Sequence, residues 1–314
     1  MVGGKRKMAK RFTIGTDPEF FLRRIDGKFI SAIPYIEGTK EVPKPLASGG
    51  SIQRDNVAVE FATVPASNGK DFVSRIRETF KDVQKEIPPE CFLEALPSAN
   101  FEQDELEHEE AQRFGCDPDF DAWELKENEA PKCKDATLRT CGGHVHVGKA
   151  DGDGNGFLAD PYGKIAVVRI MDAIHGVISV ILDNSKAAIT RRKLYGKAGS
   201  HRPVSKESGG YYDGVEYRVL SNFWFKSPQL VMLIDSLTTD ALKVVREMDY
   251  ERLIADIGNN RIRDIINKGL VKDAHKVLGD FIKPLLSEDS LYYLKECSEN
   301  LENYNFKKEW GMEV

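Results

Sequence analysis

Two histidines one residue apart lie in the segment "RTCGGHVHVGKADG" (139–152), with glycines on both sides of the pair. In a β-strand the side chains at positions i and i+2 share a face, so His144 and His146 would point one way and Val145 and Val147 the other. This pattern is typical either of two metal ligands on a rigid strand or of histidines that face solvent or satisfy local polar groups. The metal-binding interpretation requires partner side chains from elsewhere in the chain.

Carboxylates occur at comparable positions in three other segments that we predict to be strands. Asp17 and Glu19 stand two residues apart in "GTDPEFF", and Glu60 lies in "NVAVEFA". In "GVEYRVL", Glu216 and Arg218 share one face. A single polar residue is ordinary on an exposed strand face, but this set is small and flanked by glycine, proline or alanine. We therefore expect one sheet to gather these residues on one surface: Asp17, Glu19, Glu60, His144, His146 and Glu216.

Carboxylates gathered so closely repel one another unless cations lie between them. Oxygen-rich sites with one or two imidazoles suit Mg²⁺ or Mn²⁺, so we expect two or more such ions. Magnesium bound by carboxylates commonly also holds phosphate groups, which need positive charge from the protein. The basic segment "TRRKLYGKAGSHRPVSK" (190–206) could supply that charge as a phosphate-binding loop, because guanidinium groups bind phosphoryl oxygens bidentately. The alternative is a basic surface loop.

The composition is that of an ordinary globular chain of 314 residues, 30% charged and 41% hydrophobic. Its net charge of −5 gives no general reason to expect nucleic-acid binding. The basic start "MVGGKRKMAKR" is not followed by an apolar stretch, and we find no run near the ~20 apolar residues that span a membrane. The five cysteines form no CxxC motif, so we expect a reducing cytoplasm and no disulfide framework.

The patterns along the chain predict mixed strands and helices followed by helices, which favours an α+β fold. Apolar spacing predicts an amphipathic helix over 70–86 and a buried helix over 161–183, in which His175 is a core histidine. The acidic run 102–110 is interpreted as a solvated face, and "DGDGNG" (151–156) as a tight turn, with a calcium loop as the alternative. Further strands are expected at 11–24, 26–34, 55–66, 91–101 and 214–224, and helices at 227–247, 251–257, 259–268, 271–286 and 288–302.

Taken in order, "TDPEF", "GGHVHVG", "RRKLYGKAG" and "GVEYRVLSNFW" resemble the motifs of the phage-encoded carboxylate–amine ligase family. That family belongs to the glutamine synthetase-like superfamily, which includes glutamate–cysteine ligases of the second type. The segment "RFGCDPDFDAW" (113–123) is similar to a stretch peculiar to the phage branch. The resemblance covers roughly residues 11–225. It implies a glutamine synthetase-like α+β fold, with a curved antiparallel sheet whose concave face binds divalent metals and ATP.

The resemblance also implies roles for single residues. The metal ligands would be Asp17, Glu19, Glu60, His144 and Glu216. The catalytic residues would be Glu216, Arg202 and Arg218. Arg218 would contact the phosphates of ATP, and Arg192 and Arg202 fall where arginines of the family do so. Arg191 and Lys197 are further candidates for ATP binding because they belong to the basic segment, and in the expected mechanism His146 would orient the substrate carboxylate. Asp17 is a shorter acid than the glutamate that relatives carry at this position.

The implied activity is ATP-dependent formation of an amide or peptide bond through an acyl phosphate. The substrates would be small-molecule or peptide carboxylates and amines in the cytoplasm, with no nucleic acid or membrane as partner, and relatives often form homo-oligomers. We expect a basic flexible segment 1–10, a catalytic domain 11–226 and a helical part 227–314 packed on that domain. Two alternatives are a metal-dependent hydrolase with zinc on the HxH pair and a non-catalytic nucleotide-binding phage protein of the same fold.

Overall fold

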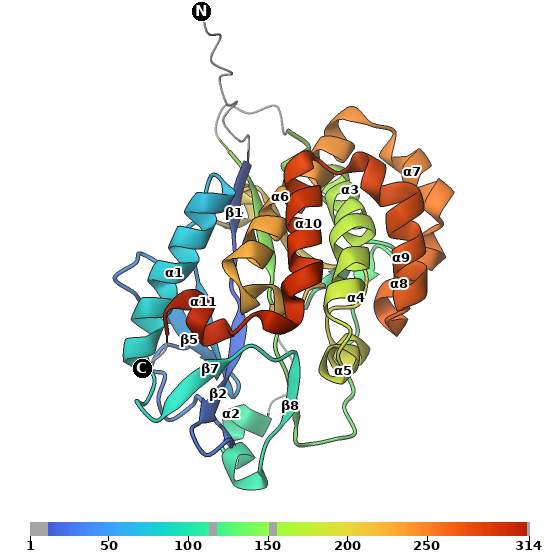
Figure 1. Ribbon diagram of the computed structural model, residues 1–314. Coiled ribbons are helices and arrows are strands. Elements are labelled where there is room, and N and C mark those ends of the chain that lie inside the picture. The colour runs from blue at the N-terminus through green and yellow to red at the C-terminus, as the bar shows by residue number, and fades with distance from the viewer. Residues whose placement is uncertain (1–11, 113–117, 151–155, 313–314) are drawn as a thin grey trace, which may run out of the picture.

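The computed structural model describes residues 12–112, 118–150 and 156–312 (Figure 1). The predicted basic segment 1–10 and most of the "DGDGNG" turn or calcium loop lie outside the described residues, as does the first part of the 113–123 segment. In Figure 1 helices lie on both sides of the strands, and several of the later helices are grouped together on the right.

The first sheet carries the HxH strand at its centre. Its six antiparallel strands run in the order β1 (Phe12–Gly15), β12 (Val145–Lys149), β14 (Gly214–Tyr217), β13 (Ser200–Val204), β9 (Phe120–Asp121) and β10 (Lys126–Glu127). In this register Glu216 lies directly between His146 on one neighbouring strand and Arg202 on the other. The register therefore brings an acid, an imidazole and a guanidinium into one row.

The second sheet carries two of the predicted carboxylates. It is built from β3 (Phe29–Ile30), β2 (Glu19–Arg24), β6 (Ala58–Ala62), β5 (Ser51–Asp55) and β4 (Lys44–Pro45), and β7 (Cys91–Glu94) also pairs with β2. Glu19 and Glu60 are direct register partners in this sheet. A separate pair is formed by β8 (Ser98–Asn100) and β11 (Leu138–Thr140).

The prediction of one sheet for all the site residues is wrong. The segment 11–24 predicts a strand with a proline interruption, and the structure has this interruption. The strand is interrupted at residues 16–18, where Pro18 lacks the N–H that a ladder needs. The chain leaves the first sheet after Gly15 and enters the second at Glu19. The two sheets adjoin at this link, because the Glu19 N–H donates to the Gly142 carbonyl at 3.0 Å and the Thr63 N–H to the Thr16 carbonyl at 3.0 Å.

Helix α1 (Gly69–Glu86) confirms the predicted amphipathic helix. The Asn68 side chain caps it by accepting a hydrogen bond from the Asp71 N–H, which satisfies one of the free donors of the first turn. The apolar residues at helical spacing are buried against the second sheet and α6: Phe72, Ile76, Phe80 and Val83.

The predicted buried helix is also present, with a π-helical turn in its middle. It consists of α3 (Pro161–Met171), the turn Asp172–Gly176 and α4 (Val177–Leu182). Contrary to the expectation from composition, Pro161–Leu182 is long and apolar enough to cross a membrane, but 83% of its apolar window is buried inside the protein, as in a core helix. His175 is 1% exposed, in agreement with its prediction as a core histidine.

The helices after residue 227 pack against both the sheets and the earlier helices. They are α6 (Pro228–Glu247), α7 (Tyr250–Ile257), α8 (Asn259–Lys268), α9 (Val271–Val277), α10 (Glu288–Asn300) and α11 (Phe306–Trp310). Helix α6 lies against α1, α3 and α10, and α9 lies against α4. In α11, Trp310 is 5.2 Å from the Phe80 ring and donates its indole N–H to the Phe225 carbonyl at 2.6 Å. The end of the chain thus returns to α1.

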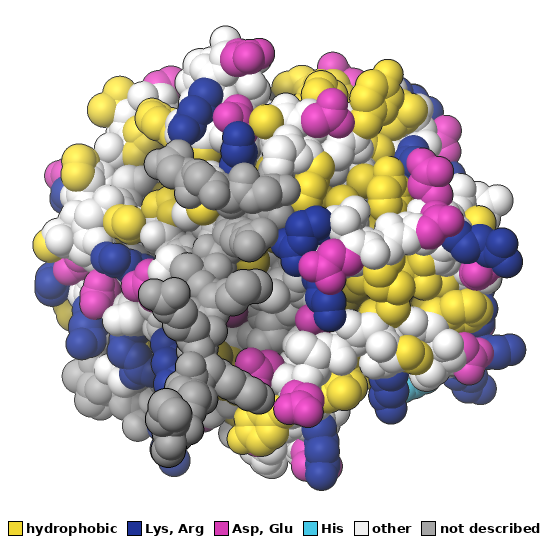
Figure 2. All heavy atoms as spheres, turned by 90° about the horizontal axis from the view of Figure 1, so that it is seen from above, with side chains coloured by type: hydrophobic (Ala, Val, Ile, Leu, Met, Phe, Trp, Pro, Cys, Tyr) yellow, Lys and Arg dark blue, Asp and Glu magenta, His cyan; other side chains and the backbone are white. Residues whose placement is uncertain are grey.

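The basic segment 190–206 is not the predicted loop. It contains the end of α5 (Lys186–Leu194) and strand β13, joined by a turn in which Gly196 and Gly199 have positive φ angles of 70° and 84°. The predicted strand 214–224 is also shorter, because a 3-10 helix occupies Asn222–Lys226. On the end of the molecule seen in Figure 2, the described Lys and Arg side chains are interspersed with Asp and Glu.

Candidate metal and phosphate site

Asp17 lies on the link between the two sheets and faces both histidines. Its Oδ1 atom is 3.0 Å from His146 Nε2 and 3.1 Å from His144 Nδ1. The neighbouring Thr16 hydroxyl donates to the His144 carbonyl at 2.7 Å and ties the link to the segment before β12. Because the strand is interrupted here, Asp17 lies between the two sheets and can face both histidines.

His146 is oriented by a partner on its other nitrogen. The Nδ1 atom is 2.6 Å from the Tyr212 hydroxyl. The Nε2 atom is buried and, although close to Asp17, has no described hydrogen-bond partner in acceptable geometry. If Nδ1 carries the proton and donates to Tyr212, the Nε2 lone pair is available as a metal ligand, the usual arrangement for a metal-binding histidine.

Glu216 is the centre of the contacts in the first sheet. Its Oε1 atom is 3.5 Å from His144 Nδ1 and 3.6 Å from Arg202 Nη1, and it forms a very short contact with Arg218 Nη1. One ligand atom each from Asp17, His146 and Glu216 lie within 4.8 Å of one another. Two carboxylates and an imidazole at this separation are a donor set that a divalent cation can join.

The charges of this cluster are strongly interdependent. Burial raises the pKa of Asp17, but the adjacent His146 and His144 outweigh burial and hold that pKa well below its ordinary value. Burial is also the largest single effect on Glu216 and raises its pKa, but Arg218, His146 and His144 together outweigh burial, so the net pKa is lowered. Burial alone would lower the pKa of His146, but Asp17 and Glu216 together outweigh it, so the net pKa is raised. The cluster is therefore organised around ionised carboxylates.

Glu19 and Glu60 form the second-sheet part of the site. Glu19 Oε2 accepts a hydrogen bond from the Gly142 N–H at 2.6 Å, and its Oε1 is 4.0 Å from His144 Nε2. Glu60 accepts from the Gln53 amide at 2.9 Å. Burial, followed by the repulsion of Asp55, Asp17 and Glu19, raises the pKa of Glu60 well above its ordinary value. His144 thus lies between the two groups of carboxylates.

The arginines that we predicted as phosphate ligands separate into two groups. Arg202 and Arg218 face Glu216, and Arg218 Nε is also 3.5 Å from Asp119. Arg192 instead donates to the Asp183 carbonyl at 2.8 Å and lies 3.7 Å from the Asp183 carboxylate, away from the cluster.

The remaining predicted cations are also differently placed. Arg191 Nη1 and Nη2 donate to the carbonyls of Val219 and Arg218, at 2.9 and 3.3 Å, so this guanidinium holds the chain after β14. Lys197 is exposed in the turn between α5 and β13. Because α5 is a helix, its consecutive basic residues point in different directions: Arg191 also lines the pocket described below, whereas Arg192 does not.

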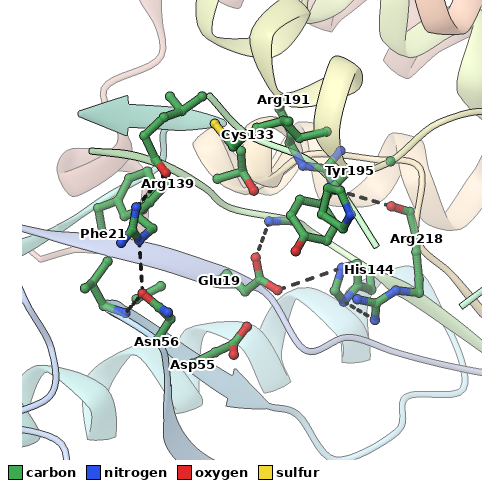
Figure 3. A pocket seen from close by; sticks show the side chains of 18 of the residues that line it. Glu19, Phe21, Asp55, Asn56, Cys133, Arg139, His144, Arg191, Tyr195 and Arg218 are labelled. Carbon is green, nitrogen blue, oxygen red and sulfur yellow. Dashed lines mark hydrogen bonds and ion pairs between the residues drawn. The ribbon is translucent and has the colours of Figure 1, made fainter. Parts of the chain in front are cut away.

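A pocket opens beside the cluster (Figure 3), and Asp17, His146 and Glu216 are not among the residues that line it. Glu19, His144 and Arg218 lie on one side of it, and Asp119 and Asp55 also line it. The opposite side is largely apolar: Phe21, Val57, Ala58, Pro131, Leu138 and Leu194. A substrate in this pocket would be in contact with the same side chains that surround the candidate metal position.

The sequence analysis missed three residues of the site. Asp55 ends β5 at a two-residue hairpin in which Asn56 has a φ angle of 54°, a common place for Asn but one that gives no sign of function. Asp119 and Tyr212 precede strands in irregular segments and had no periodicity to mark them. Asp119 is identified only by its contact with Arg218, and Tyr212 only by its contact with His146.

Comparison with known proteins gives a fold but no family. No family model matches the chain, and no curated protein matches its sequence. A bifunctional glutathione synthetase from Pasteurella multocida is similar in structure, with a TM-score of 0.50 and 11% identity over 96% of this chain and 48% of that chain. This chain thus spans about half the length of that protein.

Two more solved structures are more distant. They are a novel glutamine synthase homolog (TM-score 0.34, 12% identity, 92% of this chain and 71% of that chain) and ligand-free GmaS (TM-score 0.41, 14% identity, 94% and 70%). At 11% identity the likeness to the synthetase shows the fold alone. The predicted α+β, glutamine synthetase-like fold, with curved antiparallel sheets and flanking helices, is confirmed.

Proposed function

We propose that the chain is an ATP-dependent carboxylate–amine ligase that forms an amide or peptide bond through an acyl phosphate. The observation that carries the proposal is the convergence of Asp17, His146 and Glu216, with Arg202 and Arg218 on Glu216, at the edge of an open pocket. The motif resemblance to the phage-type ligases and the fold shared with a synthetase support it.

The donor set fits magnesium or manganese. Asp17, Glu216 and the otherwise unpartnered Nε2 of His146 would hold one ion, and Glu19 and Glu60, on the other side of His144, would hold a second. Mg²⁺ and Mn²⁺ are hard cations that prefer oxygen ligands, so a set of two carboxylates and one imidazole suits them. Such ions neutralise the negative charge of a phosphoryl group that is being transferred.

The chain's own residues would then serve phosphoryl transfer. An oxygen of the substrate carboxylate attacks the γ-phosphorus of ATP, and the bond to the β-phosphate oxygen breaks as ADP leaves. Arg218 and Arg202 are placed to donate hydrogen bonds to the equatorial phosphoryl oxygens in this step. The amine, once it has lost a proton, attacks the acyl carbon, loses a second proton and releases inorganic phosphate.

The proposal includes small-molecule or peptide carboxylates and amines as substrates and the cytoplasm as the compartment. The proposal assigns no role to nucleic acid or to a membrane surface, and it is compatible with a homo-oligomer. The buried apolar helix Pro161–Leu182 belongs to the core on this view.

The test uses the full chain with Mg-ATP, a panel of carboxylic acids, and hydroxylamine to trap an acyl phosphate as a hydroxamate. We expect ADP and hydroxamate to form with at least one acid. Asp17→Asn should lower this turnover at least about a hundredfold, since it removes a metal-ligand charge beside the transferred phosphoryl group. Asp280→Asn is the same change at an exposed position and should leave this turnover unchanged.

Two results would contradict the proposal. Tightly bound zinc without ATP binding would favour the hydrolase alternative. Binding of Mg-ATP without ADP release under any condition would favour the non-catalytic nucleotide-binding protein.

A further inference from the structure

Asp55 is a carboxylate of the pocket that has no protein partner among the described residues. It directs its side chain into the pocket next to Glu19 (Figure 3). The other carboxylates that line the pocket are engaged, because Glu19 accepts from the Gly142 N–H and Asp119 lies 3.5 Å from Arg218 Nε. Within the described part of the chain, Asp55 accepts no hydrogen bond and is in no ion pair.

Asp55 does not belong to the donor set of the first candidate ion, although it lies beside Glu19, a ligand proposed for the second. The ligand atoms that lie within 4.8 Å of one another come from Asp17, His146 and Glu216, and Asp55 is not among them. Burial and the nearby Glu19 raise the pKa of Asp55 to about 6. A cationic ligand group would relieve this unfavourable environment of the ionised carboxylate.

Near Asp55 the pocket has an apolar part and a polar pair, Arg139 and Asn56, which hydrogen-bond to each other. Val57 and Ala58 follow Asp55 in the β5–β6 hairpin, and Phe21 and Leu138 line the same space. Phe21 and Val57 belong to a small buried cluster of their own. A ligand that occupies this part of the pocket would therefore need a hydrocarbon stem beside its charged group.

A second hollow that Asp55 borders has more acidic than basic side chains in its lining. Asp55 and Asn56 line this open hollow together with Glu41, Glu109 and Glu110, against two cations, Lys40 and Arg54. Glu109 and Glu110 begin α2 (Glu109–Gln112), the second half of the acidic run noted in the sequence. An excess of carboxylates beside a pocket raises the local concentration of cationic ligands.

We propose that this pocket binds the amine substrate: a primary amine on an apolar stem, with its ammonium on the Asp55 carboxylate and its stem along Phe21, Val57, Ala58 and Leu138. A charge-assisted hydrogen bond would fix the nitrogen on the Glu19 side of the pocket, next to His144. The role of this nitrogen as the acyl acceptor rests on the proposed ligase function, whereas its binding does not.

The experiment is a ligand-observed NMR titration of the full chain with n-butylammonium as the probe, and with methylammonium and butyrate for comparison. We expect n-butylammonium to bind, methylammonium to bind at least about tenfold more weakly because it lacks three methylenes worth ~0.8 kcal/mol each when buried, and butyrate not to bind. Asp55→Asn keeps the shape of the side chain and should weaken n-butylammonium binding about tenfold or more. Asp280→Asn is the matched control and should not change it.

Separate titrations of the same variants with Mn²⁺ and with Mg-ATP distinguish the possible failures. We expect Asp55→Asn to bind as many Mn²⁺ ions as the unmodified chain, and Mg-ATP within about twofold of its affinity. Loss of one Mn²⁺ would identify Asp55 as a metal ligand and overturn the proposal, as would unchanged n-butylammonium binding or a preference for butyrate. Absence of Mg-ATP binding in the unmodified chain would instead contradict the ligase function while leaving the amine pocket standing.

Discussion

Glu216 and Arg218 are buried together, 5% and 6% exposed, and the second arginine on Glu216, Arg202, is half-buried. A buried carboxylate is tolerated because it is paired, and removing one partner leaves a charge without compensation. Replacement of Glu216 or Arg218 by alanine would therefore damage stability as well as activity. Asp17, whose side chain is 19% exposed, is the better residue for separating the two effects.

His175 offers a test of burial at the level of one side chain. The Thr238 hydroxyl donates to the Ile234 carbonyl, so His175 Nε2 must donate to Thr238, and Nδ1 is left without a described hydrogen-bond partner. Burial lowers the pKa of His175 to about 3. Below pH 6.5 the unfolded chain binds a proton that the folded chain does not, so the histidine lowers stability as the pH falls from 6.5 towards 3.

We expect His175→Gln to remove this part of the pH dependence. At pH 5 the effect amounts to about 2 kcal/mol relative to pH 7, and urea unfolding at both values measures it. The unmodified chain should lose that much more stability on acidification than His175→Gln, while His275→Gln, at an exposed position of α9, should behave as the unmodified chain. Equal losses in the chain and in His175→Gln would show that the imidazole titrates normally.

The alternation of residues along strands predicted which side chains share a face. Glu216 and Arg218 do lie together, and Tyr217 points the other way and donates to Asp172 at 2.8 Å. Alternation carries no information about residues outside strands. Arg192, in helix α5, was therefore included although it contacts Asp183. Asp55, the last residue of β5, was missed because alternation along the predicted strand 55–66 places it on the face opposite Glu60.

At the scale of elements, the "GGHVHVG" segment is shaped by what surrounds its glycines. A Cβ atom at Gly142 would lie 2.5 Å from His144 Nε2 and 3.1 Å from Arg191 Nη2. The Gly142 backbone also pairs with Glu19 in both directions, as donor to the carboxylate and as acceptor from the N–H. Because residue 142 is a glycine, the backbone can pass close to the His144 ring without displacing it.

We therefore expect Gly142→Ala to push His144 away from Asp17 and Glu19 and to lower ATP turnover at least about tenfold, with most of the effect on kcat. Gly279→Ala is the control, because no atom lies within 4 Å of its Cβ position. Turnover would be followed as ADP release, and folding by circular dichroism. Full activity in Gly142→Ala would show that His144 can move without consequence.

The helices were predicted more accurately than the basic segment for a physical reason. Helix α1 has a continuous apolar stripe, which specifies its face against the core. Residues 186–204 contain small residues, glycines and cations without such a stripe, so the helix α5 and the strand β13 depend on their neighbours. Local sequence could not show where the helix would end and the strand begin.

At the scale of the whole molecule, one hydrophobic core extends from Phe12 to Met312. It includes residues of both sheets, of α1 and α3, and of the C-terminal helices. Residue 226 therefore marks a boundary in the sequence only. The two parts pack directly on each other there, because α6 lies against α1 and α3.

We expect residues 12–226 and 227–312 to unfold together. Differential scanning calorimetry should give one transition, with a calorimetric enthalpy equal to the van't Hoff enthalpy. A fragment that ends at residue 226 would expose the surfaces covered by α6 and α11 and should not fold on its own. Two transitions, or a folded fragment, would show that the C-terminal helices are an independent domain.

The three-residue link at Thr16–Pro18 is the covalent joint of the two sheets, and it bears one of the proposed cation ligands. A hinge motion of one sheet against the other would alter the Asp17–histidine separations before it altered any strand. An ion bound by Asp17 and the histidines would therefore hold the two sheets at a fixed angle. Both sheets would become more rigid when the ion is bound. Slower amide hydrogen exchange along both β1 and β2 upon addition of Mn²⁺ would be the visible sign of that coupling.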